Sequence, residues 1–252
     1  MPIKFLHKPG IVAYLTAGDP TLEATYNIAL AAIDNGADVI ELGVPFSDPL
    51  ADGPVIQRAS ERAVARGVTL TNVLALCEQI RQARPGCGLV LFSYLNPVVR
   101  MGIKSFCAAA KSAGADGVLL TDMIVEEAGE YLHEMAANEL APIFLAAPTS
   151  PDARLKAIAK ASKGFVYAIS RVGITGTRDE IASDAPTLVA RLRAFTSLPI
   201  AVGFGISTPA HVAAVAGYAD AAIIGSALVA LIEQSRPEEA AQAVGHFIAK
   251  LR

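Results

Sequence analysis

Residues 11–43, IVAYLTAGDPTLEATYNIALAAIDNGADVIELG, contain two short apolar runs separated by an Ala-rich segment of helical period. The runs IVAYLT and DVIELG are rich in β-branched residues, which favours strands, whereas the segment between them repeats its apolar residues at the spacing of an α-helix. Gly36 follows this segment, at the position where a residue with positive φ commonly ends a helix. The stretch therefore predicts a strand–helix–strand unit.

The same alternation continues along the chain, and Gly114 and Gly164 follow later helical segments as Gly36 follows the first. The apolar runs lack strict alternation, which is typical of parallel strands covered on both faces. The predicted strands are residues 11–16, 38–43, 88–94, 117–122, 141–147, 164–170, 199–205 and 221–226.

Eight such units in 252 residues predict an α/β protein built as a closed (β/α)₈ TIM barrel, with a doubly wound open sheet as the alternative. Length alone is compatible with one domain or two. Because no Pro/Ser-rich linker interrupts the chain, we predict a single domain over residues 1–252. Active sites of barrels lie at the C-terminal ends of the strands, so polar residues there are the first candidates.

Composition excludes several classes of function. With 53% hydrophobic and 18% charged residues, the chain has enough apolar surface for a sizeable core. The net charge of −3 without clustered Lys and Arg disfavours nucleic-acid binding, and no long apolar run indicates secretion or a membrane span. Cys77, Cys87 and Cys107 lack CxxC spacing, so we expect reduced thiols in a cytoplasmic protein.

Glu41 is an acidic residue within an apolar strand, and it shares parity with Val39, so both side chains point to the same face. A buried ionised carboxylate without a partner is costly, so such a residue has a raised pKa, a partner or a catalytic role. A raised pKa suits a group that gives and takes a proton near neutral pH. A structural carboxylate paired with a hidden donor is the alternative.

The loop GVPFSDPLADGP at 43–54 follows Glu41 directly and is long for a strand-to-helix connection. Asp48 precedes a proline and Asp52 precedes a glycine, so each also fits an ordinary turn. A loop aspartate and Glu41 together form a candidate acid–base pair.

Glycine-rich segments occur at the ends of the last predicted strands, in RVGITGTRDE (171–180), GFGIS (203–207) and GSALV (225–229). Loops after strands seven and eight of barrels often bind phosphate, because backbone N–H groups converge there on an anion. Ser207 and Ser226 strengthen this prediction of a phosphate site. Close packing of strand on helix also selects glycine and is the alternative.

Three further features are candidates for substrate contact. Residues 171–185 have no clear period and are long enough for a lid, or for a plain surface loop. Phe92, Tyr94 and Tyr167 project from predicted strands, where aromatic side chains line a flat apolar pocket or belong to the core. Asp122 ends the fourth predicted strand.

Two aldolase chemistries lack their residues at the strand ends. No lysine lies near the C-terminal end of a predicted strand, where a Schiff base would form. No histidine ends a strand either, so the usual metal ligands are missing. We therefore predict acid–base chemistry on a phosphorylated substrate, with neither cofactor nor metal.

Six segments, in order over residues 10 to 250, resemble the tryptophan synthase α-subunit family, and the most specific is ELGVPFSDPLADGPVIQ (41–57). The others are YLTAGDP (14–20), APIFLAAPTS (141–150), YAISRVGITG (167–176), GFGIS (203–207) and GSALV (225–229). The resemblance implies a (β/α)₈ barrel that cleaves indole-3-glycerol phosphate to indole and glyceraldehyde 3-phosphate, a retro-aldol reaction of tryptophan biosynthesis.

Matching motif positions implies individual roles. Glu41 would handle the protons of indole C3 and of the side-chain hydroxyl, while Asp52 would accept from the indole N–H. The embedded glutamate would be protonated near neutral pH and the loop aspartate ionised. The other expected site residues are Gly176, Gly205, Gly225 and Ser226 for the phosphate, Tyr14, Phe92, Tyr94, Asp122 and Tyr167 for the pocket, and Arg171 and Thr175 for the lid.

The resemblance also implies a partner, a β subunit that binds pyridoxal phosphate and receives indole through a tunnel. Residues 45–52 and 94–102 would face it, and this chain itself would hold no cofactor. The chain has little of the family's amino-terminal helix, which leaves the closure of the barrel bottom open. Ile124 stands where the family usually has proline, so we expect β-subunit binding to differ in strength or regulation.

Two other functions stay open beside the α-type lyase. One is a stand-alone indole-3-glycerol phosphate lyase that releases free indole. The other is a barrel that no longer catalyses and only regulates a partner. The presence of both Glu41 and Asp52 argues against the second, because a pure regulator needs neither carboxylate.

Overall fold

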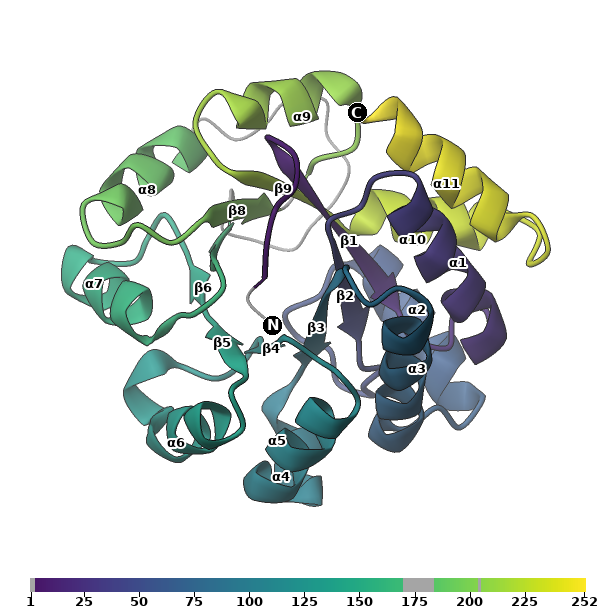
Figure 1. The fold of residues 1–252 in the computed structure, drawn as a ribbon, viewed down its shortest axis with the longest axis horizontal. Helices are drawn as coiled ribbons and strands as arrows, with labels where there is room; N and C mark the ends of the chain where they lie inside the picture. The colour runs from purple at the N-terminus through teal and green to yellow at the C-terminus, as the bar shows by residue number, and fades with distance from the viewer. Residues whose placement is uncertain (1–2, 170–183, 204) are drawn as a thin grey trace.

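The computed structural model describes residues 3–169, 184–203 and 205–252, in which parallel strands are ringed by helices (Figure 1). The strands are β1 (Gly10–Thr16), β2 (Val39–Gly43), β3 (Gly88–Ser93), β4 (Gly117–Leu120), β5 (Ala141–Ile143), β6 (Leu145–Ala146), β7 (Val166–Ile169), β8 (Ile200–Gly203) and β9 (Ala221–Ile224). The helices are α1 (Leu22–Asp34), α2 (Pro54–Ala65), α3 (Leu70–Ala83), α4 (Leu95–Met101), α5 (Ile103–Ser112), α6 (Gly129–Ala137), α7 (Asp152–Ala161), α8 (Asp184–Arg193), α9 (Pro209–Ala216), α10 (Ser226–Gln234) and α11 (Ala240–Lys250), with a 3₁₀ turn η1 (Val125–Glu127).

The sheet is a TIM barrel, as the sequence predicts, and not an open doubly wound sheet. Its strand order, β5-β4-β3-β2-β1-β9-β8-β7-β6, follows the chain around the ring. Strands β5 and β6 are two halves of one predicted strand, interrupted at Phe144, and they pair with β4 and β7 respectively. Across the described ranges no helix is long and apolar enough to cross a bilayer.

The helical pattern is confirmed in most places. Gly36, Gly114 and Gly164 all have positive φ, as their positions after helices predict. Helices α4 and α10 have no clear signal in the sequence, because α4 spans only seven residues and α10 begins inside a glycine-rich segment that resembles a loop. The three cysteines are free and buried, also as predicted.

Side chains of the strands alternate between two apolar cores. One core lies between the strands and the helices, and the other fills the barrel lumen with Val12, Val39, Val90 and Leu119 from consecutive strands. Because side chains on a strand alternate with a period of two, Glu41 shares the lumen face with Val39. The predicted parity therefore places a carboxyl inside the barrel.

The bottom of the barrel is closed by the segment that leads into β1, which lies over the centre of the ring (Figure 1). Ile3 is 7% exposed and belongs to the lumen core, and Phe5 packs edge-on against Phe165 with ring centroids 5.9 Å apart. These two apolar side chains answer the question of basal closure that the sequence left open.

An Ala-Asp pair precedes three of the strands and ties the bottom rim together. Asp38, Asp116 and Asp220 each accept a hydrogen bond from an amide of the preceding strand, at 2.8, 2.9 and 2.8 Å. Each also pairs with an arginine, which is Arg252, Arg81 and Arg193 respectively. The charged groups of the bottom rim thus serve stability, which leaves the opposite rim for chemistry.

We predict that Phe5→Ala lowers the free energy of unfolding by about 2–4 kcal/mol, because it removes a half-buried ring and its contact with Phe165. Leu6→Ala is the control, since Leu6 is 76% exposed and its loss should cost less than about 0.5 kcal/mol. Urea unfolding of both variants measures the difference. Equal effects would contradict the assignment of Phe5 as part of the plug.

Candidate active site

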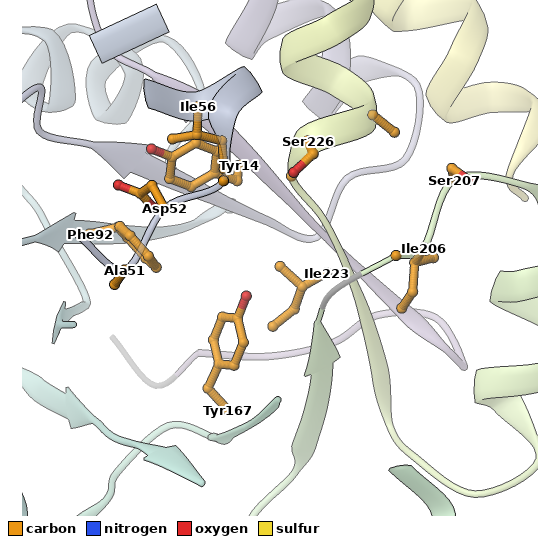
Figure 2. Close-up of a pocket in the computed structure, with 14 residues that line it drawn as sticks. Tyr14, Ala51, Asp52, Ile56, Phe92, Tyr167, Ile206, Ser207, Ile223 and Ser226 are labelled. Atoms are coloured by element: carbon orange, nitrogen blue, oxygen red, sulfur yellow. The ribbon is translucent and has the colours of Figure 1, made fainter. Parts of the chain in front are cut away.

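A cavity opens at the C-terminal ends of the strands and encloses about 660 Å³ of space, part of it open to solvent. Its lining combines aromatic and aliphatic side chains with one carboxyl and several glycine and serine residues (Figure 2). The lining residues are Tyr14, Ala51, Asp52, Gly53, Ile56, Phe92, Tyr167, Gly205, Ile206, Ser207, Ile223, Gly225, Ser226 and Ala227. An apolar pocket with a few polar groups at this end of a barrel is the expected form of an active site.

Asp52 lies in the β2–α2 loop and is 7% exposed. Its backbone carbonyl accepts from Gln57 Nε2 at 2.8 Å, which ties it to the first turn of α2. The Tyr94 hydroxyl donates to Asp52 Oδ2 at 3.0 Å and accepts from the Ala51 amide at 2.9 Å. The carboxyl is therefore held in one orientation by α2 on one side and by Tyr94 on the other.

Glu41 is fully buried on the lumen face of β2, beside Tyr14 in the strand register. Neither carboxyl oxygen has a hydrogen-bond partner among the described residues. The alternative of a structural carboxylate paired with a donor thus finds no support in this part of the chain. A buried, unpartnered acid of this kind is a candidate for proton transfer.

The two carboxyls differ in acidity. Burial raises the pKa of Glu41 to about 8. Burial also raises the pKa of Asp52 to about 6, and the hydrogen bond from Tyr94 opposes this rise. At neutral pH Glu41 therefore carries a proton while Asp52 is mainly ionised, in the order that the resemblance implies, and Asp52 is buried although it lies in a loop.

Two tyrosines extend across the lumen over glycines of the neighbouring strands. A Cβ at Gly43 would lie 2.3 Å from the Tyr14 hydroxyl oxygen, and one at Gly203 would lie 2.4 Å from that of Tyr167. Burial, and then the charges of Glu41 and Asp52, raise the pKa of Tyr167. Figure 2 shows the Tyr167 hydroxyl pointing into the cavity, between the side of Asp52 and the side of Ser226.

The far side of the cavity is backbone. Helix α10 begins at Ser226 without a side-chain cap on its first amides. A Cβ at Gly225 would meet no atom closer than 3.8 Å, and one at Gly205 would meet none within 4 Å. Packing therefore does not require glycine at either place, although the φ of +83° at Gly205 does favour it. An uncapped helix N-terminus next to an open loop can bind an anion.

Comparison with known proteins decides the family. Residues 3–252 match the sequence profile described as Tryptophan synthase alpha chain. A tryptophan synthase alpha chain of Solibacter usitatus is 50% identical over 233 residues, covering 92% of this chain and 87% of the relative. One of Burkholderia lata is 47% identical over 245 residues, covering 97% and 90%. The chain belongs to the tryptophan synthase alpha chain family.

Solved structures agree. In the tryptophan synthase α2β2 complex of Pyrococcus furiosus, a chain that is 38% identical superposes with a TM-score of 0.91, covering 97% of this chain and 98% of that one. A chain of Mycobacterium tuberculosis tryptophan synthase is also 38% identical, with a TM-score of 0.90 and coverages of 97% and 91%. The alpha chain family thus accounts for both the sequence and the fold.

The structure brings together most of the residues that the family resemblance implied. The members of this set that line the cavity are Tyr14, Asp52, Phe92, Tyr167, Gly205, Gly225 and Ser226. Gly176, Arg171 and Thr175 lie outside the described residues, as does nearly all of the predicted lid.

Two expected pocket residues lie behind the cavity wall instead. Tyr94 follows β3 and orients Asp52 from behind, so it is not part of the lining. Asp122 lies beyond the end of β4, and its Oδ1 accepts from the Leu95 amide at 2.7 Å, in the first turn of α4. Asp122 therefore caps a helix, and this helix was absent from the sequence prediction.

Three apolar lining residues were missed by the sequence analysis. Ile56 lies in the first turn of α2, Ile206 follows β8 and Ile223 is inward-facing on β9. A signal existed for Ile223, because it shares parity with Gly225 at the end of a predicted strand. For Ile56 and Ile206 the sequence shows only an isoleucine in an ordinary position.

We predict that Tyr94→Phe raises the pKa of Asp52, because the lost hydroxyl donates to the ionised carboxylate and so favours it. A carbon-13 NMR titration of the aspartate carboxyls measures the shift. Tyr131→Phe is a matched control, since the Tyr131 hydroxyl is buried but donates to the Val118 carbonyl. An Asp52 pKa that stays in place in Tyr94→Phe would refute the orienting role.

Proposed function

We propose that this chain is a carbon–carbon lyase that cleaves indole-3-glycerol phosphate to indole and glyceraldehyde 3-phosphate and delivers indole to a β subunit. The observation that carries the proposal is the pair of buried carboxyls, Glu41 on the lumen face of β2 and Asp52 in the β2–α2 loop, whose pKa values burial raises to about 8 and about 6. Two titratable groups with pKa values moved apart are a common arrangement for acid–base catalysis.

In the proposed reaction Glu41 first donates a proton to the substrate and then takes one back from it. Its carboxyl gives a proton to indole C3, and Asp52 accepts a hydrogen bond from the ring N–H, whose positive charge grows as C3 is protonated. The Glu41 carboxylate then removes the proton of the adjacent side-chain hydroxyl. The O–H electrons form the aldehyde C=O, the C–C bond breaks, and its electron pair restores the aromatic ring. Glu41 ends protonated again.

The cavity fits both ends of this substrate. Tyr14 and Phe92, which pack edge-on with centroids 5.1 Å apart, form an aromatic wall beside Asp52. The phosphate would bind the first amides of α10 at Gly225 and Ser226 and the backbone at Gly205, with Gly176 as a further expected contact. The glycerol chain would then cross the lumen between these two sites.

We further propose that Arg171 and Thr175 contribute to a lid over this cavity, as the family resemblance implies. The proposed steps require only the proton of Glu41 and the hydrogen bond accepted by Asp52, and pyridoxal phosphate would belong to the β subunit. Because the three cysteines are buried and free, we assign the enzyme to a reducing compartment, the cytoplasm.

The proposed surface for the β subunit lies at the same rim as the cavity, on the side of β2, β3 and β4. Leu50, Val99 and Ile124 are 87%, 53% and 45% exposed, and they lie in the segments that follow the neighbouring strands β2, β3 and β4. Exposed apolar side chains gathered at one rim indicate a protein contact. The chain's neighbours in solved structures include an α2β2 complex, which supports the same assignment. Ile124 here is consistent with an altered contact at this rim.

The two alternatives differ from this proposal in what they require. A stand-alone lyase needs no apolar rim for a partner, so Leu50, Val99 and Ile124 favour the assembled enzyme. A regulator without catalysis has no need of an unpartnered acid in its core, and Glu41 is such an acid.

We predict that Glu41→Gln reduces cleavage by at least about 10³-fold, because it removes both proton transfers. In the wild type, kcat/KM should rise with pH as Asp52 ionises near 6 and fall as Glu41 loses its proton near 8, because kcat/KM reports the groups of the free enzyme. The test is an assay of indole release from pH 5 to 9. The affinity of Glu41→Gln for glycerol 3-phosphate should stay close to that of the wild type.

Asp48→Asn is the control, since Asp48 is an exposed residue of the same loop. Its activity should match the wild type. Near-normal turnover in Glu41→Gln would return that residue to a structural role and overturn the proposed function.

We predict that added β subunit strongly increases indole release by the wild type. Val99→Asp should weaken this activation, because it would bury a charge at the contact. Leu6→Asp is the matched control, an equally drastic change at a 76% exposed leucine on the bottom face. Titrating β subunit into each variant gives the half-activating concentration. High activity without β subunit, unchanged on its addition, would establish the stand-alone alternative.

A further inference from the structure

Two helices carry the two halves of the proposed site. Asp52 lies two residues before α2, and Gln57 in the first turn of that helix holds its carbonyl. The proposed phosphate site is the N-terminus of α10. The position of α2 relative to α10 therefore sets the separation of Asp52 from the phosphate.

Near the cavity these helices touch through aliphatic side chains. Ile56 Cδ1 would be 3.9 Å from a Cβ on Gly225, while Ala59 of α2 and Val229 of α10 share a small apolar cluster with Tyr14. Alanine and valine form only shallow ridges on a helix surface. This contact alone therefore resists sliding of one helix along the other only weakly.

One arginine joins the same helices farther from the cavity. Arg62 of α2 donates to both carboxylate oxygens of Asp19, from Nε at 2.8 Å and from a terminal nitrogen at 2.7 Å. Its other terminal nitrogen donates to Glu233 of α10 at 2.6 Å. Arg58, one turn earlier on α2, also binds Glu233, at 2.9 and 2.7 Å. Three elements, α2, α10 and the β1–α1 loop, thus meet at Arg62.

The Arg62–Asp19 pair is largely buried, whereas the hydrogen bonds to Glu233 lie at the surface, where the Arg58 and Glu233 side chains are 50% and 26% exposed. The Asp19 side chain is 4% exposed and that of Arg62 31%. Hydrogen bonds from Arg58 and then Arg62 lower the pKa of Glu233 to about 2, so the carboxylate stays ionised throughout the working range. A two-pronged arginine contact to a buried carboxylate has a defined geometry, which a single lysine cannot reproduce.

We propose that Arg62 is a positioning residue that fixes α2 against the β1–α1 loop and α10 and thereby places Asp52 at the correct distance from the phosphate site. This inference rests on the proposed function. A misplacement of about 1 Å at a reacting centre costs on the order of a hundredfold in rate, so a loosened α2 should be visible in kcat. The phosphate site, which belongs to α10 and the loop after β8, should be largely unaffected.

The double variant Asp19→Asn with Arg62→Met tests this without leaving a buried charge unpaired. We expect kcat for indole-3-glycerol phosphate to fall by about tenfold or more, while the Kd for glycerol 3-phosphate stays within about twofold of the wild type. The acid limb of the pH profile should shift, because Asp52 moves relative to Tyr94. Arg62→Lys keeps the charge but loses the two-pronged contact, so its kcat should lie between those of the wild type and the double variant.

The matched control is Asp34→Asn with Arg84→Met, which removes another two-pronged pair, at 2.7 and 2.6 Å, between α1 and the end of α3. It should leave kcat and the pH profile unchanged. If the Arg62 double variant is folded by circular dichroism and keeps kcat within twofold, or if the control loses as much, the inference is wrong. If the double variant does not fold, Arg62→Lys with wild-type kcat and pH profile refutes it.

A carbon-13 titration of Asp52 in the same variants separates this inference from the proposed function. Should the wild type fail to cleave the substrate, the function is refuted, but a displaced Asp52 pKa in the double variant would still support the positioning role. An Asp52 pKa equal to that of the wild type would contradict it.

Discussion

The desolvation of one carboxyl, that of Glu41, is the constraint on which the site depends. The barrel lumen surrounds it with apolar side chains, and no hydrogen-bond partner lies among the described residues. Burial raises its pKa to about 8, so the group is a proton donor at neutral pH and a base after it has donated. Every other described feature of the site supplies what Glu41 cannot: Asp52 an ionised carboxylate, α10 an anion site, and Tyr14 and Phe92 an aromatic wall.

The same burial has an effect on stability. The pKa of Glu41 in the folded chain lies above its ordinary value of 4.5, so the folded state binds more protons than the unfolded one between these values. The contribution of the protonated Glu41 carboxyl to the free energy of unfolding is therefore complete below pH 4.5 and is lost as pH rises through 8. The plug formed by Ile3 and Phe5 and the aspartates of the bottom rim stabilise the end of the barrel opposite the site.

The sequence predicts the barrel because eight apolar runs alternate regularly with helical segments. It predicts a functional role for Glu41 because this acid interrupts one of the apolar runs. Parity alone placed that acid in the lumen. The features that the sequence did not predict depend on contacts between segments that are distant in the chain. Tyr94 and Asp122 looked like pocket residues, but their partners, Asp52 and the start of α4, lie 42 and 27 residues away. The burial of Asp52 and the network around Arg62 likewise arise only once the helices are packed.

The pKa of Glu41 in the folded wild-type chain tests this account most directly. Carbon-13 NMR of the glutamate carboxyls, recorded from pH 4 to 10 with Glu41→Gln to assign the signal, measures it. We expect a carboxyl that titrates near 8, well apart from the exposed glutamates. A Glu41 signal that titrates near 4.5, with the surface residues, would show that this carboxylate is solvated or paired and would contradict the central claim.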